Sequence, residues 1–185
     1  MYDNVIDENI FPSFVCSCIP QIDMMTQLEE AYDIQRQFPS ETLSNEGGYH
    51  SPKFVGTKFS TLRYTVEEFC NDLLEQKGLG LLVSNIEYWC NINKSYNYNV
   101  MHSHGRADLI GIYYIQIPPD SGNLVVMRND GSQYCDLYEN RADMLEYITE
   151  PEVGRLYVLP GHLWHYVTGN NSVGDRVSIS FNIYT

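Results

Sequence analysis

Positive charge is scarce in this sequence of 185 residues. The chain contains 11 Lys and Arg against 24 Asp and Glu, which gives a formal net charge of -13 at pH 7. Such a charge repels the phosphate backbone of nucleic acids, and the basic side chains form no run along the chain that would offset it. We therefore expect no binding to duplex nucleic acid.

Long apolar runs are also missing. No segment reaches the roughly 20 apolar residues that a membrane-spanning helix requires. The first residues, "MYDNVIDENIFPSF", carry acidic side chains where a secretory signal would be cationic. The sequence therefore predicts a protein without membrane segments that works in the cytoplasm.

Cysteine is too sparse to form a structural framework. The five cysteines are an odd set, at positions 16, 18, 70, 90 and 135. Only Cys16 and Cys18 lie close together, and no second pair completes a zinc site. We expect reduced thiols.

Apolar and aromatic side chains, in contrast, are abundant. The chain is 43% hydrophobic and contains 15 Tyr and 7 Phe. This content excludes a disordered chain and favours strands, on whose pleated surface aromatic rings pack well. The length fits one domain over residues 1–185. We expect helical support from residues 1–78 and a β core from residues 79–185.

Two helices are predicted in the first part. The segment "IDMMTQLEEAYDIQRQFP" has a Thr26/Glu29 capping box near its start, Pro39 as its stop, and one apolar face formed by Met25, Leu28, Ala31 and Tyr32. The segment "TVEEFCNDLLEQKG" has a Thr65/Glu68 capping box and ends at Gly78, with an apolar stripe of Val66, Phe69, Leu73 and Leu74. We expect both helices to pack against the core and to support it.

From residue 79 the pattern changes to short strands. Turn sequences such as "PPDSG", "RNDGS" and "TGNNSVGD" separate them. The expected strands lie in "LGLLVSNIEYWCNI", "DLIGIYYIQI", "GNLVVM", "GRLYVLP", "LWHYVT" and "RVSISFNIYT". Strands in series without intervening helices predict a mainly β fold, an antiparallel sandwich or barrel, with the helices on one outer face.

The last of these strands alternates strictly between apolar and polar residues. One face carries Val177, Ile179, Phe181 and Ile183, and the other carries Arg176, Ser178, Ser180 and Asn182. A strand buried on both sides would not normally carry four polar residues on one face. That face therefore meets water, a ligand or a polar cavity.

Four of the five histidines fall in two short segments. His102 and His104 are two residues apart in "YNVMHSHGRADLIGIYYIQI", so on an extended chain both imidazoles project to the same side. A third ligand must come from elsewhere, and "LPGHLWHYVTGN" offers His162 and His165. This clustering predicts a metal site.

The order of these motifs resembles that of the Fe(II)/2-oxoglutarate-dependent oxygenases. In that family a His-x-Asp/Glu pair precedes a strand, a distal His precedes a later strand, and an Arg-x-Ser sequence follows on the next one. Here the order is His102-Ser103-His104, "LIGIYYIQI", "GNLVVM", "GRLYVLPGHLWHYV" and Arg176-Val177-Ser178. The resemblance implies a double-stranded β-helix (jelly-roll, cupin-like) fold that uses Fe(II) and 2-oxoglutarate.

A closer resemblance is to a bacterial and phage subfamily with a His-x-His pair. The matching pieces are "SNEGGYHS", "HSHGRADLIGIYYI", "PGHLWHYV" and "RVSISFN", which together span most of the chain. This subfamily implies a location in a bacterial or phage-infected cell.

Residue roles follow from the resemblance, position by position. His102 and His165 would bind iron, Arg176 would pair with the distal carboxylate of 2-oxoglutarate, and Ser178 would hydrogen-bond the same group. The fork of a guanidinium matches a carboxylate. Tyr114 either reaches the cosubstrate with its hydroxyl or is an ordinary aromatic residue of the sheet.

The third iron ligand is open at this point. The wider family has a carboxylate where this sequence has His104, so a three-histidine site would leave one more positive charge on the ion. Asp108 could supply a carboxylate if the loop folded back. We favour His102, His104 and His165, with His162 pointing elsewhere.

The implied reaction is hydroxylation of an unidentified substrate, with consumption of O₂ and release of succinate and CO₂. A peptidyl side chain such as proline is the candidate, because "GIYYI" resembles a strand of prolyl hydroxylases. One alternative is a cupin-like three-His metal enzyme without 2-oxoglutarate, against which Arg176-Val177-Ser178 argues. Another is a non-catalytic jelly-roll binding module.

Overall fold

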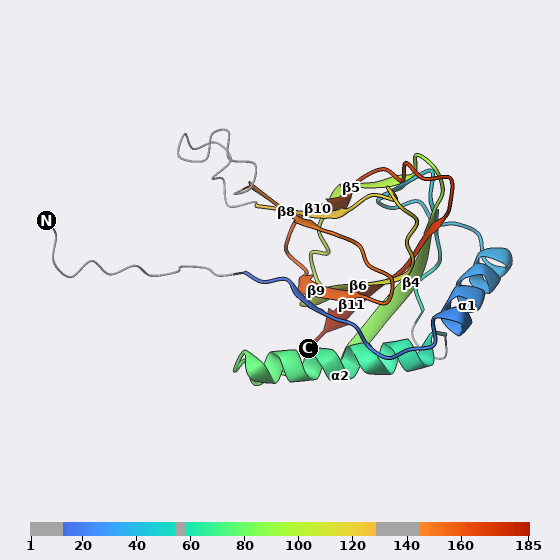
Figure 1. The fold of residues 1–185 in the computed structure, drawn as a ribbon. Helices are drawn as coiled ribbons and strands as arrows, with labels where there is room; N and C mark the ends of the chain where they lie inside the picture. The colour runs from blue at the N-terminus through green and yellow to red at the C-terminus, as the bar shows by residue number, and fades with distance from the viewer. Residues whose placement is uncertain (1–12, 55–57, 129–144) are drawn as a thin grey trace, which may run out of the picture.

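Two antiparallel sheets lie face to face in the computed structural model, which describes residues 13–54, 58–128 and 145–185 (Figure 1). The six-stranded sheet has the order β1 (Cys16–Cys18), β9 (Leu156–Pro160), β6 (Leu109–Gln116), β11 (Arg176–Tyr184), β4 (Asn85–Asn93) and β3 (Tyr49–His50). The five-stranded sheet has the order β2 (Asn45–Glu46), β5 (Tyr98–His102), β10 (His165–Val167), β7 (Leu124–Met127) and β8 (Glu146–Thr149).

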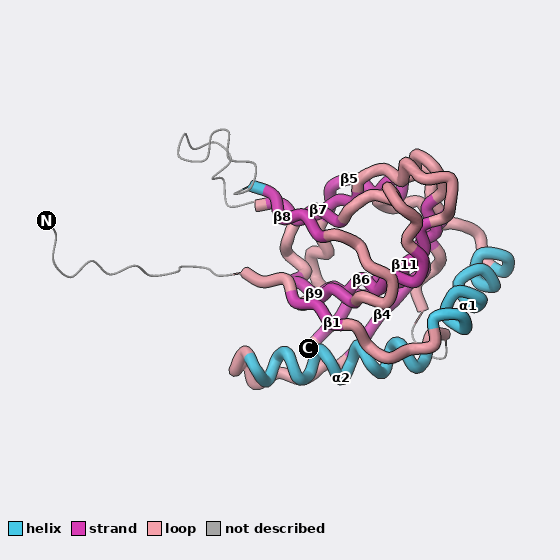
Figure 2. Tube along the Cα trace, in the orientation of Figure 1, coloured by secondary structure: helices cyan, strands magenta, loops and turns pink. Residues whose placement is uncertain are grey.

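The chain crosses repeatedly between the two sheets. Strands β4, β6, β9 and β11 belong to the six-stranded sheet, whereas β5, β7, β8 and β10 belong to the other. Following the chain from β4 to β11 therefore winds around the space between the sheets (Figure 2). This winding confirms the predicted mainly β, jelly-roll type of double-stranded β-helix.

Strand β11 is one of the two central strands of the larger sheet. It pairs with β4 over its whole length, from Arg176 opposite Asn93 to Tyr184 opposite Asn85, and with β6 on its other edge. The predicted alternation is confirmed: Val177, Ile179, Phe181 and Ile183 are fully buried on one face. These residues pack against the helices in the main hydrophobic core.

Both helices cover the outer face of the six-stranded sheet, as predicted. Helix α2 (Ser60–Gln76) runs beneath this sheet (Figure 1). Helix α1 (Met24–Gln37) packs near β6, whose Tyr113 hydroxyl donates to the sulfur of Met24 at 2.8 Å. The buried residues of α2 are Leu62, Val66, Cys70, Leu73 and Leu74, and all belong to the main core. The side of β11 that carries Arg176 is left to face the space between the sheets.

The predicted start of α1 was wrong. Asp23, not Thr26, caps the helix, because its Oδ1 accepts a hydrogen bond of 3.2 Å from the backbone N–H of Met25. Asp is as good a cap as Thr, and it lies three residues earlier. Met25, expected in the apolar face, is 65% exposed, and the buried face is formed by Gln27, Ala31 and Ile34.

The predicted start of α2 was also wrong. The helix begins at Ser60, and Thr65 lies within it, where its hydroxyl donates to the carbonyl of Thr61 at 3.0 Å. The preceding Phe59 is buried, and its N–H donates to Glu30 of α1 at 3.0 Å, a tertiary contact that no local pattern reveals. The predicted end at Gly78 is confirmed, since this residue has a φ of +66°.

Several sequence features have simple outcomes. Cys16, Cys18, Cys70 and Cys90 are free thiols, whereas Cys135 and most of the "RNDGS" turn lie outside the described residues. Short strands β1, β2 and β3 from the first part of the chain join the edges of the sheets, beside the two expected helices. Neither helix within the described residues has the length and apolar character needed to cross a membrane.

Truncation of Phe181 tests the core behind β11. The side chain is fully buried, and its ring centroid lies 6.2 Å from that of Tyr88. We expect Phe181→Ala to lower the free energy of unfolding by about 3–5 kcal/mol in denaturant titrations, because it leaves a cavity. The control Tyr64→Ala removes an aromatic ring that is 59% exposed, and should cost about 0.5 kcal/mol or less. Equal losses would contradict this description of the core.

Candidate metal centre

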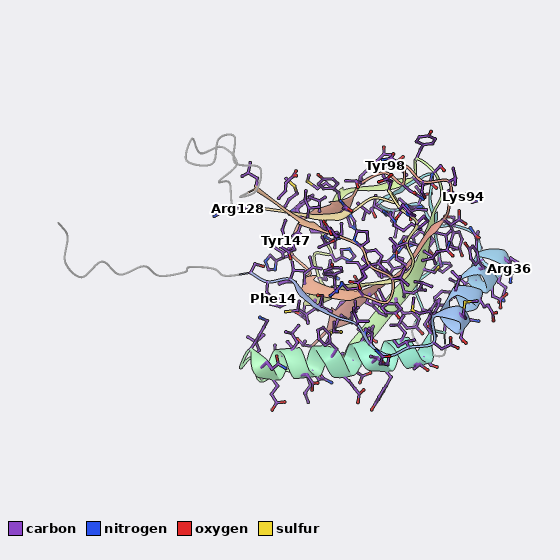
Figure 3. The ribbon with its side chains drawn as sticks, viewed as in Figure 1. Phe14, Arg36, Lys94, Tyr98, Arg128 and Tyr147 are labelled. Carbon is purple, nitrogen blue, oxygen red and sulfur yellow. The ribbon has the colours of Figure 1, made fainter. Side chains whose placement is uncertain are left out.

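A polar pocket lies between the two sheets. It is lined by residues of β4, β6 and β11 from the larger sheet and of β5, β7 and β10 from the smaller one. Among the residues that the structure describes, this lining contains no carboxylate and one fixed charge, that of Arg176. Figure 3 shows side chains filling most of the remaining space between the sheets, with Tyr98 and Lys94 on the side of β5 and Tyr147 and Arg128 at the opposite side.

Three histidines converge in this pocket. His102 is the last residue of β5, His104 lies in the turn that follows, and His165 is the first residue of β10. His102 and His165 are directly paired across the two antiparallel strands. One ring nitrogen from each of the three lies within 4.8 Å of the others, a spacing that allows them to hold one metal ion.

Each of these imidazoles is oriented by a hydrogen bond at Nδ1. The partner is the carbonyl of Val100 for His102 (2.8 Å) and the carbonyl of Leu163 for His165 (2.9 Å). For His104 it is the side-chain oxygen of Asn182, at 2.5 Å. Because all three partners are acceptors, each neutral ring places its proton on Nδ1. The lone pair of Nε2 is then free in each ring for a metal.

The three rings are neutral at pH 7. Burial lowers the pKa of His165 to about 3 and that of His104 to about 4, and it also lowers the pKa of His102. The proximity of His102 adds to the depression for the other two, whereas the hydrogen bonds at Nδ1 oppose it. Neutral imidazole is the form that coordinates metals, so the donor set fits a transition-metal ion such as iron.

The structure does not bring Asp108 into this cluster. The Asp108 side chain is exposed, and its Oδ2 accepts hydrogen bonds from the backbone N–H (2.8 Å) and the hydroxyl (3.1 Å) of Thr185. His162 is exposed, in agreement with the expectation that it points elsewhere. Among the described residues, the metal-binding group consists of His102, His104 and His165.

A close backbone approach holds the turn that carries His104. The N–H of His104 donates to the carbonyl of Gly161 at 2.9 Å, and the N–H of Gly161 donates to the carbonyl of Asp108 at 3.0 Å. A Cβ at position 161 would lie 2.1 Å from the carbonyl oxygen of Ala107. Only glycine therefore allows this turn to dock against the segment that leads into β10.

Arg176 is a buried cation that faces the pocket. It is 3% exposed, and one guanidinium nitrogen donates to the carbonyls of Ser121 (2.8 Å) and Thr168 (3.5 Å). No carboxylate of the described chain forms an ion pair with it. Burial lowers its pKa, and nearby Tyr114 opposes this effect. A buried charge without a counter-ion is costly, so the pocket favours an anionic ligand.

Ser178 and Tyr114 lie next to Arg176 in the pocket. The two residues are direct partners across β11 and β6, and both line the cavity. Burial raises the pKa of Tyr114 to about 12, while nearby Arg176 and a hydrogen bond with Thr149 act in the opposite direction. The tyrosine hydroxyl is therefore protonated at neutral pH.

Some pocket residues were not identified from the sequence. Trp89 stacks on His104, with ring centroids 5.7 Å apart, and on His50 at 5.4 Å. Four neutral polar residues form another part of the lining, where Asn91 donates a hydrogen bond to Ser180 (2.9 Å) and Asn99 donates one to Ser44 (3.2 Å). The alternation of β11 pointed to Ser180 and Asn182, but no local signal marked Trp89 or Asn99.

Comparison with known proteins gives one family match. Residues 87–182, just over half of the chain, match the family profile described as "Putative 2OG-Fe(II) oxygenase". The matched segment includes all three converging histidines, Arg176 and Ser178. No curated protein matches the chain.

Solved structures share the fold at low sequence identity. A Pseudomonas putida prolyl-4-hydroxylase is 17% identical with a TM-score of 0.63, over 92% of this chain and 91% of that one. A Trichoplax adhaerens prolyl hydroxylase, in complex with a peptide fragment of hypoxia inducible factor, is 14% identical with a TM-score of 0.64, over 92% and 83%. A viral collagen prolyl hydroxylase from Paramecium bursaria Chlorella virus-1, in complex with 2-oxoglutarate, is 9% identical with a TM-score of 0.61, over 91% and 94%.

Proposed function

Because the chain belongs to the 2OG-Fe(II) oxygenase family, whose members use Fe(II) and 2-oxoglutarate, we propose that it hydroxylates a peptidyl side chain, with proline as the first candidate. One observation carries the assignment of the site. Three neutral imidazoles converge in the same pocket as a buried guanidinium that has no carboxylate partner among the described residues. This combination suits a metal ion together with an anionic cosubstrate.

The metal ligands in this proposal are His102, His104 and His165. Three neutral donors leave the full charge of the divalent ion uncompensated, and the described part of the pocket lining adds no carboxylate. The dianion 2-oxoglutarate supplies the missing negative charge. A three-residue donor set also leaves coordination positions for cosubstrate and O₂.

The cosubstrate residues in this proposal are Arg176, Ser178 and Tyr114. The guanidinium of Arg176 would pair with the distal carboxylate of 2-oxoglutarate, and the hydroxyls of Ser178 and Tyr114 would donate to the same group. Burial favours this role, because a charge-assisted hydrogen bond is stronger when water is excluded. The pair would also offset the cost of keeping Arg176 buried.

Bound iron would supply the activation of O₂ that accompanies decarboxylation of 2-oxoglutarate to succinate and CO₂. The protein contributes orientation and exclusion of water. Hydrogen bonds at Nδ1 fix the planes of the three imidazoles, and Trp89 covers one face of His104. The hydrogen bonds orient the donor atoms, and the cover by Trp89 limits the access of water to this part of the site.

The choice of a prolyl substrate is supported by similarity in fold. The Pseudomonas putida and viral proteins are prolyl hydroxylases, and the Trichoplax adhaerens enzyme is bound to a peptide. In this chain the pocket wall formed by Ser44, Asn91, Asn99 and Ser180 is polar and carries no charge. A neutral peptide backbone is compatible with such a wall, which offers hydrogen bonds and no ion pair.

Direct assays test the reaction. Anaerobic addition of Fe(II) and 2-oxoglutarate should produce a visible charge-transfer band, and admission of air should release succinate. A panel of peptides with and without proline should then show succinate release above the uncoupled rate for the prolyl peptides. A protein that retains iron but shows neither band nor succinate would instead support a three-His metal enzyme without 2-oxoglutarate. Equal rates with all peptides would contradict the prolyl assignment.

Substitution of the two candidate third ligands tests the metal site. His104→Ala should weaken Fe(II) binding by more than the roughly 10- to 100-fold that a change outside the coordination sphere costs. Asp108→Asn should leave it within about twofold of the original value, because the exposed Asp108 side chain bonds Thr185. Anaerobic calorimetric titration measures both affinities. The reverse ranking would assign the third ligand to Asp108.

Substitution of Arg176 tests the cosubstrate site. Arg176→Met should weaken 2-oxoglutarate binding by roughly 100-fold or more, while Fe(II) affinity stays unchanged. The affinity of Arg176→Lys for 2-oxoglutarate should lie between those of the original protein and Arg176→Met, because lysine keeps the charge and loses the planar fork. Titration of the charge-transfer band gives the dissociation constants. The control Arg155→Met removes an arginine that pairs with exposed Glu152. Unchanged 2-oxoglutarate affinity in Arg176→Met would refute the assigned role.

A further inference from the structure

A carboxylate lies two hydrogen bonds away from the ring of His104. Glu87 on β4 is the direct partner of Asn182 on β11. Its Oε2 accepts hydrogen bonds from Lys53 Nζ (2.9 Å), from the hydroxyl of Tyr184 (3.0 Å) and from Asn182 Nδ2 (3.3 Å). The other end of the Asn182 amide accepts from Nδ1 of His104 at 2.5 Å.

The carboxylate of Glu87 determines how the amide of Asn182 is oriented. The amide of Asn182 could in principle present either its oxygen or its NH₂ group to His104. An ionised carboxylate only accepts hydrogen bonds, so Glu87 requires the NH₂ group on its own side. The amide oxygen must then face His104, and this ring must carry its proton on Nδ1.

The reverse orientation of the Asn182 amide would prevent His104 from coordinating a metal ion. If the amide turned around, its NH₂ group would face Nδ1 of His104, and the ring would become the acceptor there. A neutral imidazole would then carry its proton on Nε2, the atom directed at the other two histidines. His102 and His165 do not have this ambiguity, because backbone carbonyls accept their Nδ1 protons.

Glu87 is charged at neutral pH and is held in place. The hydrogen bond from Lys53 is the largest cause that lowers its pKa, partial burial opposes this, and Asn182 and Tyr184 add to the lowering. Its side chain is 27% exposed, and that of Lys53 is 41% exposed. Lys53 also lies over the ring of Trp89, 5.8 Å from its centroid.

We propose that Glu87 is a positioning residue of the metal centre, which acts through Asn182 to fix the tautomer of His104 that can bind the ion. This inference rests on the proposed role of His104 as a ligand. It also means that negative charge, which the described lining residues do not carry, is present just behind the third imidazole. Outer-sphere partners of this kind typically change metal affinity by roughly 10- to 100-fold.

Binding of Co(II) to the whole protein, followed by calorimetry and by visible absorption, tests this role without reference to activity. Glu87→Gln replaces the carboxylate by an amide of the same shape that allows Asn182 to turn. We expect the dissociation constant for Co(II) to rise by roughly 10- to 100-fold, with a changed absorption spectrum. Thermal unfolding of the metal-free variant shows whether the fold is retained.

A matched control separates this effect from a change in overall charge. Glu152→Gln removes the same charge from another ion-paired glutamate, which bonds Arg155 and does not line the pocket. It should change Co(II) affinity by less than about twofold. An equal loss in both variants would overturn the inference, as would unchanged affinity in Glu87→Gln.

A second substitution provides a rescue. Asn182→Asp places a group that only accepts hydrogen bonds beside Nδ1 of His104, so the required tautomer no longer depends on Glu87. Adding it to Glu87→Gln should restore Co(II) affinity to within about threefold of the original protein. A double variant no better than Glu87→Gln would indicate a merely structural Glu87 and overturn the inference. If the unmodified protein bound no Co(II), the proposed metal site itself would fail.

Discussion

Strand β11 is hydrogen-bonded along both edges, and this double pairing fixes the register on which the site depends. A shift by one residue would turn every side chain of the strand to the opposite face. The apolar row, Val177 to Ile183, is locked against the helices, so the polar row must face the pocket. Helix packing on the outside thereby determines where Arg176, Ser178 and Asn182 lie on the inside.

The charge of the pocket differs in sign from that of the protein as a whole. The protein as a whole carries a net charge of -13, yet the pocket residues in the described ranges include a buried guanidinium and no carboxylate. Three histidines remain uncharged there because burial disfavours their cationic form. A divalent ion would therefore enter a site with neutral donors and one nearby positive charge. In the proposed function, the anionic cosubstrate would balance these charges, and its binding would then be coupled to that of the metal.

The sequence predicts the parts of this structure that depend on local periodicity. The alternation of β11, the His102/His104 spacing and the Gly78 helix end are each written in a few consecutive residues. Other features depend on contacts between distant segments, such as the hydrogen bond from the N–H of Phe59 to the carboxylate of Glu30 at the start of α2. Asn182 lies 95 residues from Glu87 and 78 from His104. No short motif can encode such a relation, so the support behind His104 emerges only from the fold.

The three imidazoles differ in what anchors them. Backbone carbonyls hold His102 and His165, and no side-chain replacement at Val100 or Leu163 removes these acceptors. A side chain holds His104, and that side chain depends on a further one. Two of the proposed ligands are thus held by the backbone, whereas the third depends on two other side chains. In the proposed metal centre, a substitution at Asn182 or Glu87 would therefore alter the third imidazole and leave the anchors of His102 and His165 in place.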